Sequence, residues 1–355
     1  MDWVGLGSGL LPAIAYGDAA GLPLEGQPAV PGIRELLPDY ANPLFGGPAG
    51  MWSDDTQLSV AVVCGLIAAG GFDIDVIAQE HVTQLAATPT VQRNGVTIFR
   101  GWGNSTVSAV IRYHQGVPVD QCGTKEGAGN GVLMKLAPLV FWQQAKETSA
   151  AVAQEQWDVL TKFTHDSDIA RVCTRVHAEV LGFVLGGGAS VDVADFAHAT
   201  ATKHEAALDA PGVVSEHLGD LAELKRRGER HLRSVASRQS ESGQLYGFYA
   251  PETLVCAYGA FSLWGSEPEL ADAVYGAVSL GGDTDSVASI IAAMMVFKHG
   301  PSLVLPADYR TLTQIDGLEA LSRDFAVAAA ADPGCRSALT SKPASFSQSS
   351  TNGQR

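Results

Sequence analysis

Apolar runs of helical length recur along this chain, whereas the alternating pattern typical of half-buried strands is sparse. Aspartate or serine precedes many of these runs, and glycine or proline follows them, which is how helices commonly begin and end. Alanine and glycine are abundant and aromatic residues make up only 7% of the chain, so closely packed helices are favoured over a β-sandwich. We therefore predict an all-α fold. The expected helices are Gly9–Ala19, Gln57–Ala69, Ile74–Ala87, Val107–Tyr113, Gly131–Gln144, Ser149–Thr161, Asp168–Leu185, Val191–Ala207, Val213–Ser237, Pro251–Leu263, Glu267–Val278 and Asp285–His299, with Asp55, Asp168, Asp283 and Asp285 as N-caps.

Two acidic clusters, far apart in the sequence, each lead into one of these apolar runs. The first is Ser53–Thr56 (Ser-Asp-Asp-Thr) and the second is Gly281–Ser286 (Gly-Gly-Asp-Thr-Asp-Ser). Carboxylates this close repel one another, and an apolar helix beside them makes their desolvation costly, so a cation would stabilise them. Plain helix capping explains either cluster alone, because one side-chain oxygen makes a cap. The pair instead favours a hard divalent ion, Mg²⁺ or Mn²⁺, and two clusters brought together could hold two ions.

The composition restricts the classes of partner. The chain has 355 residues, is 46% hydrophobic and carries a formal net charge of −15 at pH 7. This charge argues against a protein that binds nucleic-acid backbones, although it does not exclude nucleic acid as a substrate. The basic run Lys225–Arg230 has two interpretations, a solvated helix face, which we favour, and a patch for a partner or nucleic acid.

The cysteines and the apolar runs bear on the compartment. The five cysteines are scattered and never spaced as CxxC, so we expect buried thiols in a reducing compartment and no disulfide framework. The longest apolar runs, Leu58–Ala69 and Val287–Phe297, are too short to span a bilayer. The N-terminus has no basic segment typical of a secretory signal. We expect a soluble cytoplasmic protein with no membrane partner, and we favour a monomer.

Six short motifs follow one another between about residues 9 and 300. They are Ala15–Glu25, Trp52–Thr56, Gly129–Pro138, Thr164-His165, Gly247–Leu254 and Gly281–Ser286. In this order they resemble the motifs of the ADP-ribosylglycohydrolases. The resemblance implies a single all-α domain of orthogonally packed helices, at residues 1–335, with a cleft for a binuclear metal centre. The polar segment 336–355 has little to bury, and we expect it to be a disordered tail.

The resemblance also implies a set of site residues. Two Mg²⁺ ions (or Mn²⁺) would be held by Ser53, Asp54, Asp55, Asp283, Asp285 and Ser286. The ADP-ribose would be bound by Gly127, Gly129, Asn130, Gly131 and His165. Glycines at 127, 129 and 131 let a backbone approach a diphosphate closely. Asp55 or Glu25 would handle the proton in catalysis. Asp18 matches a carboxylate near the metals, and capping of a helix or loop is an equally good interpretation of it.

The implied activity is Mg²⁺-dependent hydrolysis of the glycosidic bond between ADP-ribose and a modified protein side chain, with arginine as the first candidate. Two alternatives stay open. One is release of ADP-ribose from serine, nucleic acid or a small O-linked conjugate. The other is a non-catalytic member of the fold that binds ADP-ribose; the presence of all six metal-ligand candidates argues against it. The partner is therefore an ADP-ribosylated protein or a small-molecule ADP-ribose conjugate.

Two further segments have two interpretations each. Gln92–Asn94 is either a loop between helices, which we favour, or a polar ligand loop. The aromatic side chains of Tyr246, Phe248 and Tyr249 either stack on an adenine or pack in the core or a lid.

Overall fold

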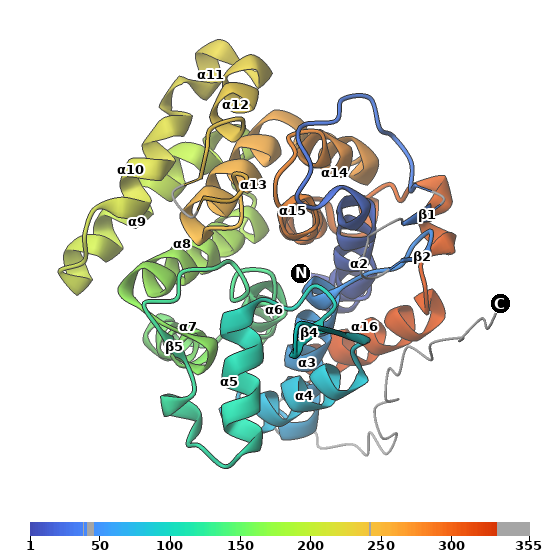
Figure 1. Cartoon of the computed structure of the whole chain (residues 1–355). Helices are drawn as coiled ribbons and strands as arrows, with labels where there is room; N and C mark the ends of the chain where they lie inside the picture. Colours follow the sequence, from blue (N-terminus) through green and yellow to red (C-terminus); the bar gives the residue numbers. More distant parts are fainter. Residues whose placement is uncertain (38, 41–45, 241–242, 332–355) are drawn as a thin grey trace.

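The computed structural model describes residues 1–37, 39–40, 46–240 and 243–331. Helices account for nearly all the regular structure in these ranges, and the strands form short pairs (Figure 1). The prediction of an all-α fold is confirmed. The segment 336–355, which we expected to be a disordered tail, lies outside the described residues, as does Cys335.

The helices begin and end as follows. The α-helices are α1 (Trp3–Gly7), α2 (Leu10–Gly21), α3 (Asp54–Ala69), α4 (Ile74–Ala87), α5 (Asn104–His114), α6 (Leu136–Ala145), α7 (Ala150–Thr164), α8 (Asp168–Leu185), α9 (Val193–Leu208), α10 (Val213–Gly219), α11 (Leu224–Arg227), α12 (Glu229–Ala236), α13 (Ala250–Trp264), α14 (Leu270–Val278), α15 (Thr284–His299) and α16 (Ile315–Ala330). The strand pairs are antiparallel β1 (Asp39–Tyr40) with β2 (Gly47–Pro48), antiparallel β3 (Thr90–Arg93) with β4 (Val96–Phe99), and parallel β5 (Thr124–Lys125) with β6 (His165–Asp166).

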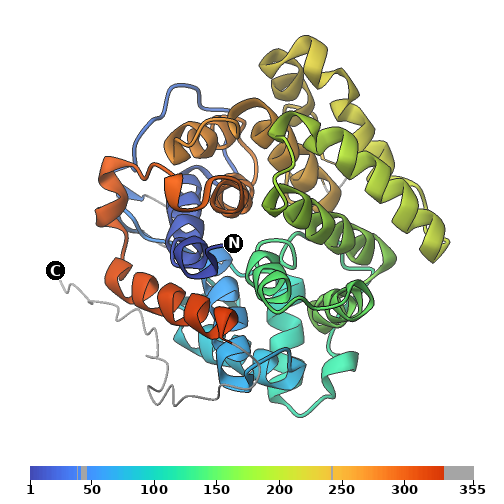
Figure 2. The same cartoon turned by 180° about the vertical axis from the view of Figure 1, so that it is seen from behind.

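Helices α2 and α15 form the centre of the molecule and lie side by side in both Figure 1 and Figure 2. Every residue of α2 is buried. Two glycines one turn apart allow the close approach. A Cβ on Gly17 would come within 2.4 Å of the Ala288 carbonyl oxygen, and one on Gly21 within 2.3 Å of the Asp285 backbone nitrogen. Small residues are therefore required on this face of α2, and the contact brings the N-terminus of α15 against the end of α2.

Helix α16 was not predicted from the sequence, and it packs against the N-terminal helices (Figure 2). The Ser322 hydroxyl accepts a hydrogen bond from the Leu11 backbone nitrogen at 3.1 Å and donates one to the Gly7 carbonyl at 2.7 Å. The Phe325 ring lies 5.4 Å from the ring of Phe141 on α6. The two ends of the described chain thus share one core with α6.

The helix predicted at Val213–Ser237 is wrong as a single element. It is divided into α10, a 3₁₀ turn, α11 and α12. Gly228 separates α11 from α12, because its φ of +60° and ψ of −150° lie outside the helical region. Lys225 in this segment forms ion pairs with Asp192 and Asp195, and Arg226 pairs with Glu223. These pairs support the interpretation of the basic run as a solvated helix face.

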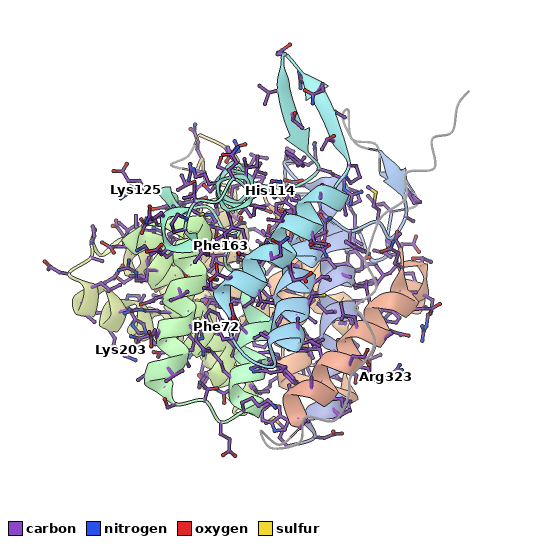
Figure 3. All side chains as sticks on the ribbon, turned by 90° about the horizontal axis from the view of Figure 1, so that it is seen from below. Phe72, His114, Lys125, Phe163, Lys203 and Arg323 are labelled. Carbon is purple, nitrogen blue, oxygen red and sulfur yellow. The ribbon has the colours of Figure 1, made fainter. Side chains whose placement is uncertain are left out.

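Gln92–Asn94, where we favoured a loop between helices, instead lies in the β3–β4 hairpin. Figure 3 shows this hairpin standing out from the helices. Its turn is Asn94-Gly95, with φ +51° and +78°. Asn-Gly is a preferred pair for a tight two-residue hairpin turn, because both residues tolerate positive φ. The sequence therefore contained the signal for this hairpin.

No helix in the described ranges is long and apolar enough to cross a membrane. In the same ranges the cysteines are buried free thiols, namely Cys64, Cys122, Cys173 and Cys256.

Candidate functional site

The first acidic cluster is oriented by a carboxylate from another helix. Asp18 on α2 accepts hydrogen bonds from the backbone nitrogens of Ser53, at 2.8 and 2.9 Å, and Thr56, at 3.0 Å. It also accepts from the hydroxyls of Ser53 and Thr56, at 2.9 and 2.6 Å. Asp18 therefore caps α3, as one interpretation of the sequence proposed. Asp54 and Asp55 stand in the first turn of this capped helix, so neither of them is its N-cap.

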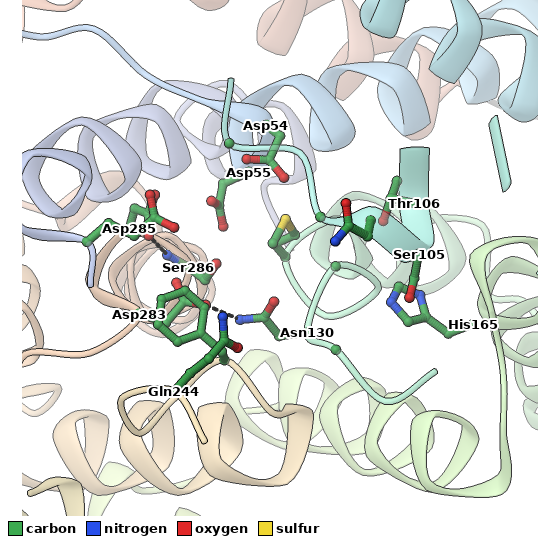
Figure 4. Close-up of a pocket in the computed structure, with 18 residues that line it drawn as sticks. Asp54, Asp55, Ser105, Thr106, Asn130, His165, Gln244, Asp283, Asp285 and Ser286 are labelled. Carbon is green, nitrogen blue, oxygen red and sulfur yellow. Dashed lines mark hydrogen bonds between the residues drawn. The ribbon is translucent and has the colours of Figure 1, made fainter. Parts of the chain in front are cut away.

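The second cluster is at the start of α15. The backbone nitrogen of Ser286 donates a hydrogen bond to one carboxylate oxygen of Asp285, at 3.0 Å. The side-chain nitrogen of Asn130 donates a 2.8 Å hydrogen bond to Asp283 (Figure 4). Asp283 is the N-cap residue of α15, and Asp285 lies in the first turn. Asn130 thus connects the glycine segment 127–131 to the second cluster.

The two clusters meet across one cavity. Figure 4 shows Asp54 and Asp55 on one side, with Asp283, Asp285 and Ser286 on the neighbouring side. Oxygen atoms of Asp18, Asp55 and Asp285 lie within 4.8 Å of one another. The cavity has a volume of about 330 Å³, and the side chains of Glu25, Asp54, Asp55, Asp283, Asp285 and Ser286 line its acidic part. The close approach of α2 to α15 therefore brings together carboxylates from two distant parts of the chain.

Burial and mutual repulsion raise the pKa values of these carboxyl groups. Burial, with the charge of Asp18, raises the pKa of Asp54 to about 8, and burial, with the charge of Asp283, raises the pKa of Glu25 to about 8. The pKa values of Asp55 and Asp285 lie well above their usual range, mainly because both groups are buried. No lysine or arginine contributes to any of these shifts. The cluster therefore lacks a compensating positive charge from the described residues.

The donor set fits divalent cations that prefer oxygen ligands. Carboxylates supply the negative charge, and the Ser286 hydroxyl supplies a neutral oxygen beside them in the same wall. Only oxygens are offered by these side chains, which suits Mg²⁺, Mn²⁺ or Ca²⁺ better than zinc or copper. A bound cation would also remove the repulsion that raises the pKa values. The residues of the cavity wall that could hold metal are Asp54, Asp55, Asp283, Asp285 and Ser286. Asp18 has an oxygen within 4.8 Å of Asp55 and Asp285, but its carboxylate already accepts hydrogen bonds from Ser53 and Thr56.

The opposite part of the cavity is built from the glycine segment and His165. Strand β5, just before this segment, pairs in parallel with β6, so that Thr124 lies opposite His165. A Cβ on Gly129 would lie 3.6 Å from Nε2 of His165, and one on Gly131 would lie 3.4 Å from its Cε1. The short β5–β6 pair therefore holds the His165 ring against the glycine backbone at the cavity wall.

A model of the ADP-ribosylglycohydrolase family matches residues 8–334 of the chain. The chain belongs to this family. It is also similar to the ADP-ribosylarginine hydrolase Tri1 of Pseudomonas putida (strain GB-1), with 26% identity over 309 residues that cover 84% of this chain and 71% of the relative. A solved structure described as an ADP-ribosylglycohydrolase-related protein complex covers 92% of this chain and 99% of its own, with a TM-score of 0.67 and 24% identity. That likeness shows a shared fold.

Family membership confirms the resemblance inferred from the six motifs and identifies the chain as a glycohydrolase of ADP-ribose conjugates. The structure brings most of the expected site residues of this ADP-ribosylglycohydrolase to one cavity. Those that line it are Glu25, Asp54, Asp55, Gly129, Asn130, Gly131, His165, Asp283, Asp285 and Ser286.

Two expected site residues lie outside the cavity wall. Ser53 is fully buried, and its hydroxyl donates to Asp18, with a longer contact of 3.4 Å to Asp55. Gly127 pairs through its carbonyl with the Ser167 hydroxyl at 2.7 Å and through its N–H with the Thr124 carbonyl at 3.2 Å. Both residues therefore hold neighbouring parts of the site in place in this structure. Ser167 is also the N-cap of α8, a role that we predicted for Asp168.

Other parts of the wall were missed by the sequence analysis. These are Gly101, Gly103, Asn104, Ser105 and Thr106, from the start of α5 and the turn before it. Met134, which belongs to the motif Gly129–Pro138, and Gln244, just before the aromatic residues considered as ligand contacts, also line the cavity. The run Gly103–Thr106 of small and polar residues ahead of an apolar helix was an available signal. Phe248 lines the cavity as well, as one interpretation of the aromatic segment proposed, whereas Tyr246 is buried in the core.

Proposed function

We propose that this ADP-ribosylglycohydrolase hydrolyses the glycosidic bond between ADP-ribose and a modified protein side chain, with arginine as the first acceptor to test. The observation that carries the proposal is the composition of the cavity. Acidic residues from α3 and α15 form one part of the wall, while glycine backbone and His165 form another. The first part suits metal-assisted chemistry at a ribose, and the second can accommodate a diphosphate.

We propose Mg²⁺, with Mn²⁺ as the alternative, as the cofactor, in two sites. Asp54, Asp55, Asp283, Asp285 and Ser286 would hold the ions, and Ser53 would join them only if its hydroxyl turned away from Asp18. A divalent ion here would supply Lewis-acid polarisation of substrate or water oxygens. The protein keeps two of the ligand candidates oriented. Asn130 holds Asp283, and the Ser289 hydroxyl donates to Asp55 at 2.9 Å.

Glu25 and Asp55 are the residues that we propose to handle the proton during hydrolysis. Glycosidic cleavage passes through an oxocarbenium-like transition state, which is helped by an acid at the leaving group and a base for the attacking water. Both carboxyls line the cavity. Ser289 holds Asp55 in one orientation, whereas no side chain of the described residues hydrogen-bonds Glu25. Glu25 is thus free to follow the substrate, and Asp55 acts from one position.

Arginine is the first acceptor to test because the curated relative is named as an ADP-ribosylarginine hydrolase. The acceptor is the finer part of the proposal and needs a direct comparison. A panel of ADP-ribosyl-arginine, ADP-ribosyl-serine and ADP-ribosylated nucleic acid would be assayed for ADP-ribose release. Each substrate would be assayed with Mg²⁺, with Mn²⁺ and with a chelator.

We expect release from the arginine conjugate with metal and loss of that release with chelator. Asp54→Asn should abolish release with metal present, while Asp120→Asn, a change of an exposed aspartate outside the cavity, should leave it intact. Turnover that is equal in chelator would overturn the metal assignment. Release from serine alone would retain the hydrolase and replace the acceptor. Tight ADP-ribose binding with no release from any conjugate would overturn the catalytic proposal.

A further inference from the structure

A lysine is sealed inside the protein behind the cavity wall. Lys135, at the N-cap of α6, has no exposed surface. Its Nζ lies 5.6 Å from the centre of the Phe163 ring, and no carboxylate of the described residues raises its pKa. Burial lowers the pKa of Lys135 to about 7. Burying an amine costs free energy unless its N–H groups form hydrogen bonds, so we consider which residues accept them from Lys135.

The partners of Lys135 form a chain of hydrogen bonds that reaches the cavity. Nζ of Lys135 lies 3.3 Å from Nε2 of His81 on α4 and 3.4 Å from the Thr164 hydroxyl at the end of α7. The Thr164 hydroxyl in turn lies 2.9 Å from Nδ1 of His165. All four side chains are almost completely buried, with His165 alone reaching the cavity wall.

The donor and acceptor of each hydrogen bond in this series can be assigned by starting from His81, the residue farthest from the cavity. Nδ1 of His81 lies 2.8 Å from the Ile77 carbonyl oxygen, which can only accept, so this nitrogen carries a proton. The pKa of His81 is well below its usual range because of burial and the charge of Lys135, so the ring is neutral. Nε2 of His81 is therefore an acceptor, and Lys135 donates to it.

The same logic continues from Lys135 to the cavity. Below pH 7 Lys135 is mainly an ammonium group, which has no lone pair, so Thr164 accepts from it. The hydroxyl of Thr164 has one proton, and among the described residues Nδ1 of His165 lies beside it. Thr164 therefore donates its proton to Nδ1 of His165. Burial and the charge of Lys135 lower the pKa of His165 to about 3, so its ring is neutral and carries a single proton. With Nδ1 accepting, that proton is on Nε2, the nitrogen near Gly129.

We propose that Lys135, acting through Thr164, holds His165 in the tautomer with its proton on Nε2, so that the cavity wall presents a hydrogen-bond donor to an acceptor atom of the ligand. Lys135 and Thr164 are positioning residues in this arrangement, because neither of them lines the cavity. The part that concerns the ligand rests on the proposed function, with ADP-ribose as the ligand. The tautomer itself is a property of the free protein.

The tautomer can be measured without any substrate. In protein labelled with ¹⁵N in its nine histidines, long-range proton–nitrogen correlation spectra distinguish protonated from unprotonated ring nitrogens. The His165 signals are assigned by their loss in His165→Gln. Below pH 7, where Lys135 is mainly charged, we expect an unprotonated Nδ1 and a protonated Nε2 in the unchanged protein. A proton on Nδ1 would overturn the proposal, and this measurement does not depend on any variant of the chain of hydrogen bonds.

Variants then test the cause. Thr164→Val removes the hydroxyl and Thr164→Ser keeps it, so the first should move the His165 proton towards Nδ1 and the second should not. Lys135→Met should have the same effect as Thr164→Val. Lys135→Arg keeps a charged donor, so it should leave the His165 proton on Nε2. Thr161→Val is the matched control, since Thr161 is a buried threonine one turn earlier on α7 that bonds to Trp157 and Thr174. An unchanged tautomer in Thr164→Val that retains the native fold by circular dichroism would overturn the role of Thr164.

Binding of ADP-ribose tests the consequence for the ligand. Titration calorimetry should show about tenfold weaker binding for Thr164→Val, the usual cost of losing one hydrogen bond to a charged group, and unchanged binding for Thr161→Val. Equal affinity despite a changed tautomer would overturn the contact between His165 and the ligand. Failure of the unchanged protein to bind ADP-ribose would overturn the proposed function instead, and would leave the measured tautomer standing.

Discussion

The carboxylate of Asp18 accepts hydrogen bonds from both the hydroxyl and the backbone nitrogen of Thr56, at 2.6 and 3.0 Å. Asp18 belongs to α2 and Thr56 to the first turn of α3, so this contact joins two helices at the candidate metal centre. Asp54 and Asp55 stand in the same first turn. Asp18 does not line the cavity, but by capping this turn it orients the carboxylates of Asp54 and Asp55 towards the cavity.

Removal of this tertiary cap should therefore affect both stability and activity. Asp18→Ala leaves the N–H and hydroxyl groups of Ser53 and Thr56 without their acceptor. We expect it to lower the free energy of unfolding by about 2 kcal/mol or more, and the activity by about tenfold or more. Urea unfolding and the hydrolase assay measure the two effects.

The matched control for Asp18 is Asp73, which caps α4 locally by accepting from the backbone nitrogens of Asp75 and Val76. Asp73→Ala should cost about 1 kcal/mol and leave hydrolysis unchanged, because α4 contributes no residue to the cavity wall. Full activity of Asp18→Ala would contradict the proposed orienting role.

The close contact of α2 with α15 predicts a sharp difference between glycines. Gly21→Ala would place a Cβ within 2.3 Å of the Asp285 backbone, whereas a Cβ on Gly9 would find its nearest atom 3.9 Å away. We expect Gly21→Ala to destabilise the fold by about 1–3 kcal/mol and to weaken metal binding, since the strain falls on the start of α15. Gly9→Ala is the control and should change neither the unfolding midpoint nor the affinity for metal measured by calorimetry.

Neutralising a carboxylate of the cluster should stabilise the metal-free protein. Asp54 is buried among like charges, and its pKa is raised to about 8 for these reasons. Asp54→Asn removes part of this repulsion, so in chelator we expect it to be more stable than the unchanged protein by about 1 kcal/mol or more. Addition of Mg²⁺ should raise the thermal midpoint of the unchanged protein and not that of Asp54→Asn. A metal-dependent rise of equal size in both proteins would show that Asp54 is not a ligand.

Buried histidine predicts a loss of stability in acid. His177 on α8 is neutral and buried, with Nδ1 3.2 Å from the Tyr258 hydroxyl, and burial lowers its pKa to about 3 from an ordinary value of 6.5. The folded state resists protonation that the unfolded chain accepts. The contribution of His177 to stability is therefore complete above pH 6.5 and is lost as the pH falls from 6.5 towards 3, by about 1.4 kcal/mol per pH unit.

Two variants that cannot titrate isolate this contribution. Urea unfolding between pH 7 and 5 should show a shallower loss of stability for His177→Gln and His177→Phe than for the unchanged protein. The two variants will differ in absolute stability because one is polar and the other is not. Their dependence on pH should nevertheless agree, and a slope equal to that of the unchanged protein would contradict the effect.

Local sequence patterns were sufficient to predict the positions of most helices. Ile74–Ala87 and Asp168–Leu185 have the predicted bounds, because apolar periodicity together with capping and terminating residues lies within each segment. The helix predicted at Gly131–Gln144 begins only at Leu136, since the glycine segment before it forms turns at the cavity wall. A sequence pattern does not distinguish the start of a helix from a turn that a ligand site requires.

Residue type and local spacing were enough to predict the all-α class, the family motifs and the residues that we propose to carry the chemistry. Three features could be seen only in the folded chain: Ser53 turns to Asp18, the start of α5 joins the cavity wall, and Lys135 is enclosed behind His165. Those arrangements follow from which helices approach each other closely. That approach depends on contacts such as Gly21 against Asp285, between residues that are remote in sequence and whose pairing leaves no local pattern.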